Sequence, residues 1–453
     1  MIRFTNTLGG EKKEFTPLSP PRVTLYACGP TVYDVPHVGH ARLEIVFDVL
    51  RRYLRWRGFD VFYVRNVTDV DDKIINRANE EGVDAFVIAD RYTRAYDDAM
   101  RDLNVLPPDV APRASGHIIE MQDMIGRLID AGCAYPGEGS VYFAVEKFDG
   151  YGKLSGRGLE QLANRERVEP APGKHHALDF ALWKAAKPGE PAWPSPWGPG
   201  RPGWHIECSV MATRYLGQPF DIHGGGADLI FPHHENEIAQ SEALETPFAC
   251  LWLHEGHLNF GGEKMSKSTK NYVEVTELLR DHQPQVVRML FCIAHYRSQM
   301  DFVPEALAEA RSVWERFRGF LRIAPTTEAD KAAIATRLAA FGEAMDDDLN
   351  TPAALAALHE LVRDGHSAIE RGEDATAGEI RSAVVEALDV LGCATEADER
   401  SDLVGPLVDA LLAEREAARA RKDFDRADAI RNRLTEIGIT VEDSASGPRW
   451  FLS

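Results

Sequence analysis

The chain has 453 residues, of which 44% are hydrophobic and 27% are charged, and its formal net charge is −20. A chain of this length exceeds one compact core, so we expect about three domains. The composition is that of an ordinary folded protein, and no run of about 18 apolar residues that could cross a membrane is present. The negative charge argues against a general nucleic-acid binder, so any RNA contact requires a local basic patch.

The cysteines are too scattered for a disulfide scaffold, which predicts a cytoplasmic location. The first residues also lack the long apolar run that directs secretion. In a reducing compartment a cysteine near histidines indicates metal binding or catalysis, and we expect the other cysteines to lie in the core. The six are at positions 28, 133, 208, 250, 292 and 393.

The N-terminal part of the chain alternates strands and helices. Residues 22–30 (RVTLYACGP) are β-branched and aromatic, and they predict a strand. Residues 40–59 carry an apolar stripe at helical spacing, with Gly58 as a plausible helix end. A second strand is predicted in 60–70 and a second helix over 72–81. Short connections between these elements predict a parallel α/β sheet.

Later segments complete this organisation. Helices continue to about residue 131, and Gly- and Pro-rich residues 132–203 indicate an insertion with long loops between two halves of the sheet. Strands are expected again at 220–225 and 249–256. The expected fold is therefore α/β, a Rossmann-like parallel-sheet domain with an insertion, followed by an α-helical bundle and a small α+β unit. The predicted parts are 1–131 (first half of the sheet domain), 132–203 (insertion), 204–260 (second half), 261–300 (a basic loop region), 301–397 (helical bundle) and 398–453 (a helical hairpin with a short strand or two).

The segment PHVGHAR (36–42) lies between the first strand and the first long helix. Ligands bind at the carboxyl ends of strands in an open parallel sheet, and a helix start there offers free N–H groups to phosphate. Gly39 permits close approach of a nucleotide, and His37 and His40 can hydrogen-bond phosphoryl oxygens. Loop histidines are more often structural, so this element alone does not decide the function.

The segment EKMSKSTKN (263–271) is a basic loop that follows Gly261 and Gly262. The ammonium groups of Lys264 and Lys267 can neutralise a triphosphate and the pyrophosphate that leaves it. An ordinary solvated Lys/Ser loop is the alternative interpretation.

A third segment, GADLIFPHHENEIAQSEA (226–243), places two histidines and two glutamates in five consecutive positions. The residues after the histidines predict a helix with Pro232 in its first turn. His233 and Glu237 then share one face and can bind one metal ion, although a hydrogen-bonded polar face fits equally well.

The HVGH and KMSKS elements together are similar to the motif pair of class I aminoacyl-tRNA synthetases. Valine here replaces the isoleucine of the usual HIGH, and Thr269 and Lys270 replace the family's common Leu-Gly, which bears on the flexibility of the loop. The resemblance to the cysteinyl-tRNA synthetase family runs from residue 2 to about 450. It is carried by YACGPTVYDVPHVGHAR, YVRNVTDVDDKIINRANEEG, GRPGWHIECSVMA, FDIHGGGADLIFPHHENEIAQSEA and AHYRSQMDF.

The resemblance implies zinc ligands at Cys28, Cys208, His233 and Glu237. Zinc prefers a thiolate to an alcohol, which would separate cysteine from serine without an editing domain. Because four protein ligands close a tetrahedral site, we expect five-coordination or a weak bond to Glu237. The neighbouring His234 is expected to orient the site or to pack beneath it.

The implied reaction forms cysteinyl-adenylate and pyrophosphate from L-cysteine and ATP·Mg²⁺, and then transfers cysteine to tRNA(Cys). His37 and His40 would stabilise the transferring phosphoryl group, and Lys264 and Lys267 the departing pyrophosphate. Further candidates are Gly39, Gly224, Gly226 and Asp228 for ATP, and Thr68 and Trp204 for the amino acid.

For tRNA, the helical region after residue 300 resembles an anticodon-binding bundle. Residues 415–433 hold seven basic and four acidic residues, a local excess over the negative chain average. The predicted tRNA contacts at helical spacing are Arg415, Arg419, Lys422 and Arg426, with a solvated mixed-charge helix as the alternative. Trp450 and Phe451 either stack on a base or close a small core.

Rival interpretations remain at this point. A mycothiol-type ligase that joins cysteine to a small amine shares the activation chemistry but lacks a full RNA-binding tail, so the C-terminal unit favours the synthetase. A zinc hydrolase centred on His233 leaves HVGH and KMSKS unexplained, and an inactive regulator disagrees with intact motifs. We expect a monomer, from the family alone, with neither membrane nor DNA as a partner.

Overall fold

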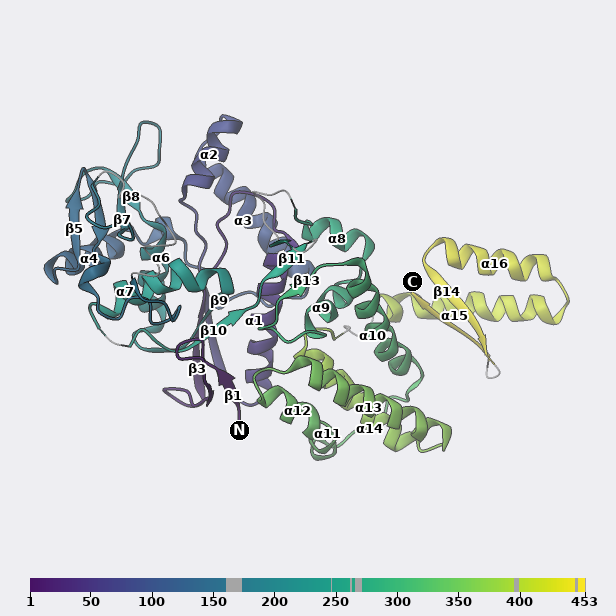
Figure 1. The fold of residues 1–453 in the computed structure, drawn as a ribbon. Helices are drawn as coiled ribbons and strands as arrows, with labels where there is room; N and C mark the ends of the chain where they lie inside the picture. The colour runs from purple at the N-terminus through teal and green to yellow at the C-terminus, as the bar shows by residue number, and fades with distance from the viewer. Residues whose placement is uncertain are drawn as a thin grey trace. The chain divides into compact units, whose positions relative to one another are not determined.

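The computed structural model describes residues 1–159, 173–245, 247–260, 263–264, 271–394, 399–444 and 447–452 (Figure 1). The chain divides into two compact units, Met1–Cys393 and Ala394–Ser453. Within the described ranges, no helix is both long enough and apolar enough to cross a membrane.

A parallel four-stranded sheet with the order β10-β9-β3-β4 lies in the first unit. Leu25 pairs with Tyr63 on one side and with Ile222 on the other. The order of the strands reverses at β3, so ligands are expected at the carboxyl ends of β3 and β9. This confirms the predicted parallel α/β sheet. The strands are β3 (Arg22–Ala27), β4 (Asp60–Arg65), β9 (Phe220–Gly226) and β10 (Ala249–Glu255), and a small hairpin, β1 (Arg3–Thr5) with β2 (Lys12–Glu14), precedes them.

The helix α1 (Val38–Trp56) connects β3 to β4 and packs against β4 and β9. Its apolar positions Ile45, Leu50 and Leu54 are buried, as the predicted stripe requires. Gly58 follows its C-cap with a φ of +88°, a conformation that glycine adopts without strain. The predicted second helix is also confirmed. The helices after β4 are α2 (Asp72–Glu81), α3 (Ala85–Asp102) and α4 (Ile118–Asp130), with a 3₁₀ turn η1 (Ala114–Gly116) between the last two.

The insertion contains an antiparallel sheet where long loops were predicted. Three of its four strands have only three or four residues, and the surrounding chain is rich in Gly and Pro, so no alternating run of apolar residues announces them. Its members, in the spatial order β5-β6-β7-β8, are β5 (Ala134–Gly137), β6 (Ser140–Phe143), β7 (Phe180–Ala185) and β8 (Gly200–Pro202), with η2 (Val145–Lys147) following β6.

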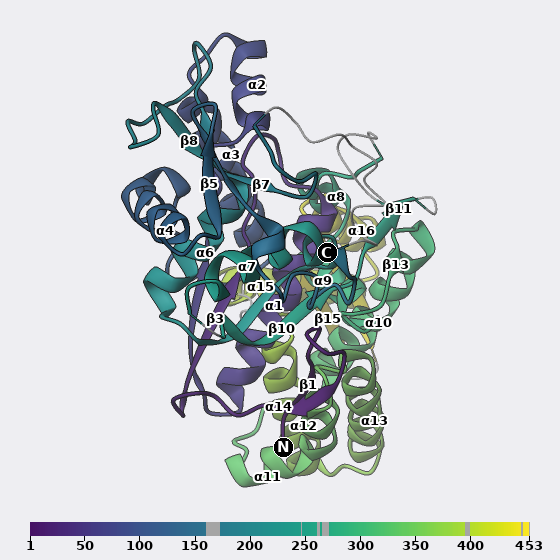
Figure 2. The same cartoon turned by 60° about the vertical axis from the view of Figure 1, so that its left-hand side comes forward.

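Figure 2 shows β8 beside α2, where Asp72 accepts hydrogen bonds from Lys184 and Arg201. From β8 the chain enters α6 (Trp204–Leu216), which contacts β3, β4 and β7. These contacts attach the insertion to α2 on one side and, through α6, to the parallel sheet on the other.

After β9, the chain passes through η3 (Ala227–Leu229) and η4 (Ile230–His234) into α7 (Glu235–Glu242). The helix predicted from the sequence is confirmed, but Pro232 lies in the irregular turn η4 and not in the first turn of α7. A small sheet with the order β12-β11-β13 follows β10. It consists of β11 (Leu258–Phe260), β12 (Glu263–Lys264) and β13 (Met300–Asp301), with α8 (Val275–Asp281) and α9 (Pro284–Cys292) between the last two.

Helices make up the rest of the first unit, as predicted. The end of α1 contacts this helical region, since α1 packs on α9 and α14. The helices are α10 (Pro304–Ile323), α11 (Lys331–Arg337), α12 (Ala339–Asp346), α13 (Thr351–Glu370) and α14 (Asp374–Val390).

The second unit is the predicted helical hairpin with two strands. Val408, Leu412, Ile430 and Leu434 form its small apolar core with the first strand. The elements are α15 (Glu399–Ala420), α16 (Phe424–Glu436), β14 (Ile439–Ser444) and β15 (Gly447–Leu452), and the two strands pair antiparallel.

Candidate active site

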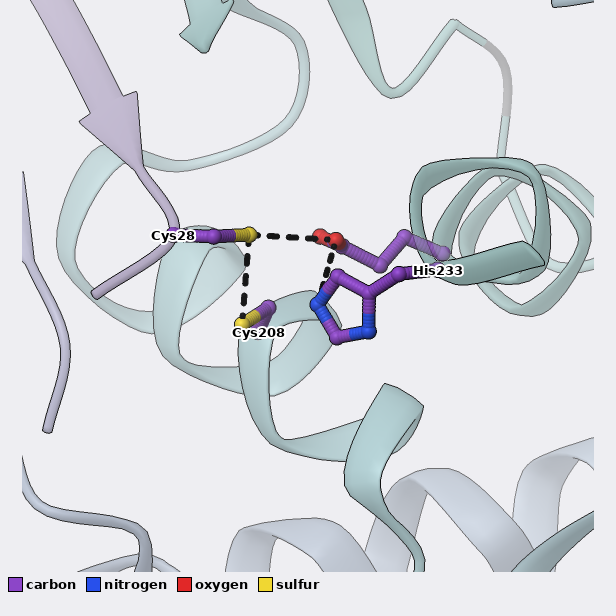
Figure 3. Close-up of side chains that lie close together, drawn as sticks. Cys28, Cys208 and His233 are labelled. Carbon is purple, nitrogen blue, oxygen red and sulfur yellow. Dashed lines mark hydrogen bonds and ion pairs between the residues drawn. The ribbon is translucent and has the colours of Figure 1, made fainter. Parts of the chain in front are cut away.

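Four potential metal ligands meet at the carboxyl end of β3 (Figure 3). Cys28 directly follows β3, Cys208 lies on α6, His233 lies in η4, and Glu237 lies on α7. Their ligand atoms are all within 4.8 Å of one another, and all four side chains are buried. The Sγ atoms of Cys28 and Cys208 are 3.5 Å apart, and His233 Nε2 is 3.1 Å from Glu237 Oε1. The structure thus brings together the four residues that the resemblance named.

The donor atoms fit a metal ion. His233 Nε2 is buried and makes no hydrogen bond, although Glu237 Oε1 lies 3.1 Å away. Two lone pairs at this distance are costly unless both atoms bind a cation. Burial raises the pKa of the Cys28 thiol well above its ordinary value, and burial also raises the pKa of Cys208. A bound cation would supply the positive charge that two buried thiolates need. Two sulfurs, one imidazole and one carboxylate form a ligand set that suits zinc.

Three further histidines surround the cluster, and the sequence analysis missed them. His205 Nδ1 is 2.8 Å from His233 Nδ1, so it can orient that ring. His223 Nε2 is 2.8 Å from the second carboxylate oxygen of Glu237. His254 Nε2 is 2.7 Å from His234 Nδ1, and the other nitrogen of His254 is bonded to Thr7.

Burial favours the neutral form of four histidines in and around the cluster, His205, His233, His234 and His254. Burial lowers the pKa of His205 and of His254 to about 3, and burial also lowers the pKa of His233 and His234 well below the ordinary range. His234 Nε2 is 3.2 Å from Cys28 Sγ, so His234 does lie against the ligands as expected. A second set of atoms, from Cys28, His223, His234 and Glu237, also fits within 4.8 Å. The sequence could not reveal this network, because its members come from four separate elements.

Of the two amino-acid pocket candidates, Trp204 contacts the cluster directly, and Thr68 is linked to it through Asn66, whose Oδ1 is 3.6 Å from Cys208 Sγ. The indole of Trp204 stacks on His233 with ring centroids 4.1 Å apart. Thr68 Oγ1 donates to Glu207 Oε2 (2.8 Å) and accepts from Asn66 Nδ2 (3.3 Å). Asn66 and Glu207 were not predicted.

The HVGH segment forms the N-terminus of α1. His37 is the N-cap, and its Nδ1 accepts from the N–H of Gly39 at 3.1 Å. His40 Nδ1 accepts in turn from the N–H of His37 at 3.1 Å, which completes a capping box. The two imidazole rings stack with centroids 3.8 Å apart, and both side chains are half-buried. A side chain on Gly39 would approach the His37 ring to 2.9 Å, so glycine keeps this turn tight.

Two residues that follow the KMSKS segment, Val273 and Val275, are hydrogen-bonded to the start of α1. The N–H of Val38 donates to the carbonyl of Val273, and the N–H of Val275 donates to the carbonyl of Pro36. The backbone of Lys264 pairs with Asn259 in the β11–β12 ladder. The Lys264 side chain, and all of Lys267, Thr269 and Lys270, lie outside the described residues.

The glycines at the end of β9 have different surroundings. A Cβ on Gly224 would lie 2.1 Å from the Phe47 ring, so this buried glycine allows α1 to pack closely on β9. Gly224 was predicted to line the nucleoside pocket, and this packing is a second reason for a glycine at that position. Gly226 ends the strand, where a Cβ would lie 2.5 Å from Asp228 Oδ1, and Asp228 is exposed. The last two residues remain candidates for a ligand contact.

The four predicted tRNA contacts differ in their exposure to solvent. Arg419, Lys422 and Arg426 are exposed, and Arg426 pairs with Glu414 at 2.6 Å. Arg415 is only 4% exposed, because its position faces the hairpin core, so it does not belong to the exposed basic surface.

Of the two aromatic residues predicted either to stack on a base or to close a core, the structure bears on Trp450. Trp450 donates to Asp409 Oδ1 at 2.8 Å and packs on the core of the second unit, which favours the core-closing role. The Phe451 side chain lies outside the described residues.

The remaining cysteines are partly as predicted. Cys292 and Cys393 are buried core residues, and Cys133 is half-buried. The expectation is wrong for Cys250, which is exposed because it occupies the outward-facing position of β10.

Solved structures with a similar arrangement are class I synthetases. Methionyl-tRNA synthetase of Mycobacterium tuberculosis aligns with a TM-score of 0.56 at 16% identity, over 82% of this chain and 89% of that one. A leucyl-tRNA synthetase of Agrobacterium radiobacter aligns with a TM-score of 0.60 at 11% identity, over 85% and 88%. At these identities the likeness shows the fold, which is that of class I aminoacyl-tRNA synthetases.

The sequence comparisons are more specific. The model of the class I tRNA synthetase (C) catalytic domain matches residues 14–312, a DALR domain matches 340–395, and the cysteinyl-tRNA ligase anticodon binding domain matches 402–450. The cysteine–tRNA ligases of Geobacter metallireducens and Stutzerimonas stutzeri are 48% and 49% identical, over 99% and 100% of this chain and 99% of each relative. The chain therefore belongs to the cysteinyl-tRNA synthetase family.

Proposed function

We propose that this enzyme activates L-cysteine with ATP and transfers it to tRNA(Cys), at the carboxyl ends of β3 and β9. The observation that carries the proposal is the position of Cys28 and His37. The segment that follows β3 supplies a ligand to the buried Cys/His/Glu cluster at its start, and nine residues later it supplies two histidines at the N-terminus of α1, where the helix dipole favours a phosphate. One sheet edge therefore offers recognition of a thiol and of a nucleotide.

We assign zinc to Cys28, Cys208, His233 and Glu237. Bound there, zinc would favour the thiolate of cysteine over the hydroxyl of serine. Trp204, stacked on His233, would limit the space beside the substrate side chain. The Thr68 hydroxyl donates a hydrogen bond to Glu207, so its oxygen can accept a hydrogen bond from the substrate ammonium group.

His37 and His40 are assigned to the transferring α-phosphate, with Gly39 allowing close approach and Mg²⁺ accompanying ATP. Lys264 and Lys267 are assigned to the departing pyrophosphate. Their support is that Val273 and Val275, which follow the lysine segment in the chain, are hydrogen-bonded to the start of α1. Gly224, Gly226 and Asp228 are assigned to the nucleoside.

For the acceptor, we assign Arg419, Lys422 and Arg426 to the phosphates of tRNA. Residues 261–300 would contact the stem, 301–397 would form the anticodon-binding bundle, and 398–453 would add a further tRNA contact. We also propose a monomer, and a cytoplasmic location based on the cysteine usage.

The test is aminoacylation with ATP, Mg²⁺, labelled cysteine and an unmodified tRNA transcript that carries a GCA anticodon. We expect charged tRNA from the wild type and its loss in Lys267→Ala. Replacement of Lys422 and Arg426 by Glu should raise the KM for tRNA without changing cysteine-dependent ATP–pyrophosphate exchange. Adenylate formation without any tRNA charging would instead support a small-amine ligase, and serine charging at a rate comparable to cysteine would contradict the assigned selectivity.

A further inference from the structure

A fully buried arginine lies one turn after the histidines of the HVGH segment. Arg42 on α1 is 1% exposed, and its Nε is 3.1 Å from Glu255 Oε1 at the end of β10. Its Nη1 donates to the carbonyl of His257 at 3.0 Å. Its Nη2 donates to the carbonyls of Tyr296 and Ser298 at 3.3 and 2.6 Å.

These partners lie at the base of the small sheet that leads into the lysine loop. His257 directly precedes β11, the strand that pairs with β12 and therefore with the backbone of Lys264. Ser298 lies two residues before β13, the other neighbour of β11. Arg42 thus joins one helix to both chain segments that support the KMSKS region.

The contact between those two segments is unusually close. The N–H of Gly256 donates to the Tyr296 carbonyl at 2.8 Å. A Cβ on Gly256 would lie 2.4 Å from the Ser298 carbonyl oxygen, so no other residue fits without moving the backbone. The guanidinium group of Arg42 fills this junction with a planar array of donors, whereas a lysine would bring a single ammonium group.

We propose that Arg42 is a positioning residue for the activation of cysteine, which fixes the histidines at the start of α1 relative to the lysine loop. The inference rests on the proposed roles of His37, His40, Lys264 and Lys267. Two groups that act on one triphosphate must hold their separation, and a misplacement of about 1 Å can cost roughly 100-fold in rate. The hydrogen-bond and ion-pair partners of Arg42 are backbone carbonyls and Glu255, so it would not contact a reacting atom. It acts through the backbone of residues 257, 296 and 298.

The test compares Arg42→Lys with Arg51→Lys in the full-length protein. Arg51 lies on the same helix and is equally buried, but its guanidinium donates to the carbonyls of Leu106 and Pro107, far along the chain from either motif. We expect both variants to lower the melting temperature. Only Arg42→Lys should lower kcat of ATP–pyrophosphate exchange, by about 10- to 100-fold, with the KM for cysteine and the zinc content within about two-fold of the wild type.

A milder variant, Glu255→Gln, keeps an acceptor for Arg42 Nε and removes the charge. It should lower kcat by several-fold and leave the KM for cysteine unchanged, and it tests the proposal if Arg42→Lys does not fold. Equal loss of kcat in the Arg42 and Arg51 variants, an unchanged kcat in Glu255→Gln, or a loss confined to the cysteine KM would each overturn the proposal. A wild type without cysteine-dependent exchange would reject the proposed function itself.

Discussion

The two ends of the candidate site are built in different ways. The metal cluster is buried, and its ligands come from β3, α6, η4 and α7. The phosphate end, by contrast, is a half-exposed turn in which His37, Gly39 and His40 satisfy one another within four residues. In the proposed function, selection of a small side chain would depend on the whole fold, whereas phosphate handling would depend on the start of α1 and on the lysines of the KMSKS segment.

This difference follows from the chemistry of the two ligands. A thiol differs from a hydroxyl by little in size, so discrimination needs a dry cavity with fixed donors, and fixed donors need packing on every side. The triphosphate is large and highly charged, and it can be bound by backbone N–H groups and mobile ammonium groups near solvent.

The largest expected effect is at the buried end. Cys208→Ser should abolish stoichiometric zinc binding and lower cysteine-dependent ATP–pyrophosphate exchange by at least about 100-fold, because an alcohol is a poor zinc ligand. Cys292→Ser is the matched control, since Cys292 is equally buried but lies outside the cluster. Elemental analysis measures the metal. Full zinc content in Cys208→Ser would contradict the assigned ligand set.

At the phosphate end, His37→Asn should lower kcat of the exchange by about 100-fold through loss of charge stabilisation in the transition state. Asparagine also caps helices, so the melting temperature should change little. The zinc content should equal that of the wild type, because the two ends are built separately. Loss of zinc from His37→Asn would contradict the inference that the two ends of the site are built separately.

The third prediction concerns pH and the metal-free protein. His205 and His254 have pKa values of about 3 in the folded state because they are buried, against an ordinary value of 6.5. Between these values the unfolded chain binds protons that the folded chain does not. The unfolding free energy should therefore fall as the pH is lowered below about 6.5, by up to about 1.4 kcal/mol per pH unit for each histidine.

Urea unfolding from pH 7.5 to 5, with a chelator present, measures this slope. The variant His254→Gln removes one of the two histidines and should make the unfolding free energy depend less steeply on pH. An identical slope in the variant and the wild type would show that His254 titrates normally in the folded protein.

The smallest effect is expected at the wall of the pocket. Trp204→Phe keeps an aromatic ring but reduces the stacking on His233, a contact of about 0.5–1.5 kcal/mol. The KM for cysteine should rise by about 3- to 10-fold at unchanged kcat and zinc content. Trp193→Phe in the insertion should leave KM unchanged. A larger fall in kcat than rise in KM for Trp204→Phe would assign that residue to the chemical step.

Periodicity and local chemistry predicted much of this molecule. The strands at 22–27 and 60–65 and the helix at 72–81 follow from uninterrupted patterns, and each was found. The strands of the insertion were missed because three of the four have only three or four residues, in a part of the chain rich in Gly and Pro. The packing role of Gly224 was missed for a related reason, since a turn glycine and a packing glycine have the same sequence context.

The site was predictable only where its parts are local. His37 with His40, and His233 with Glu237, meet through a single helical turn, so their spacing is informative. Cys208 was assigned by family resemblance, because nothing near it in the sequence marks it as a ligand. His205, His223 and His254 reach the cluster through tertiary packing, and sequence spacing carries no information about such contacts.

The long separation between the thiol ligands has a further consequence for folding. Cys28 and Cys208 are 180 residues apart, yet their sulfur atoms are 3.5 Å apart. An ion held by both would act as a cross-link that closes a long loop, and only a chain with β3, α6 and α7 already assembled presents all the donors. Binding to the folded state alone adds about 4 kcal/mol of stability when free metal exceeds its dissociation constant 1,000-fold. The resistance of this enzyme to proteolysis would then report how much metal was available when the chain folded.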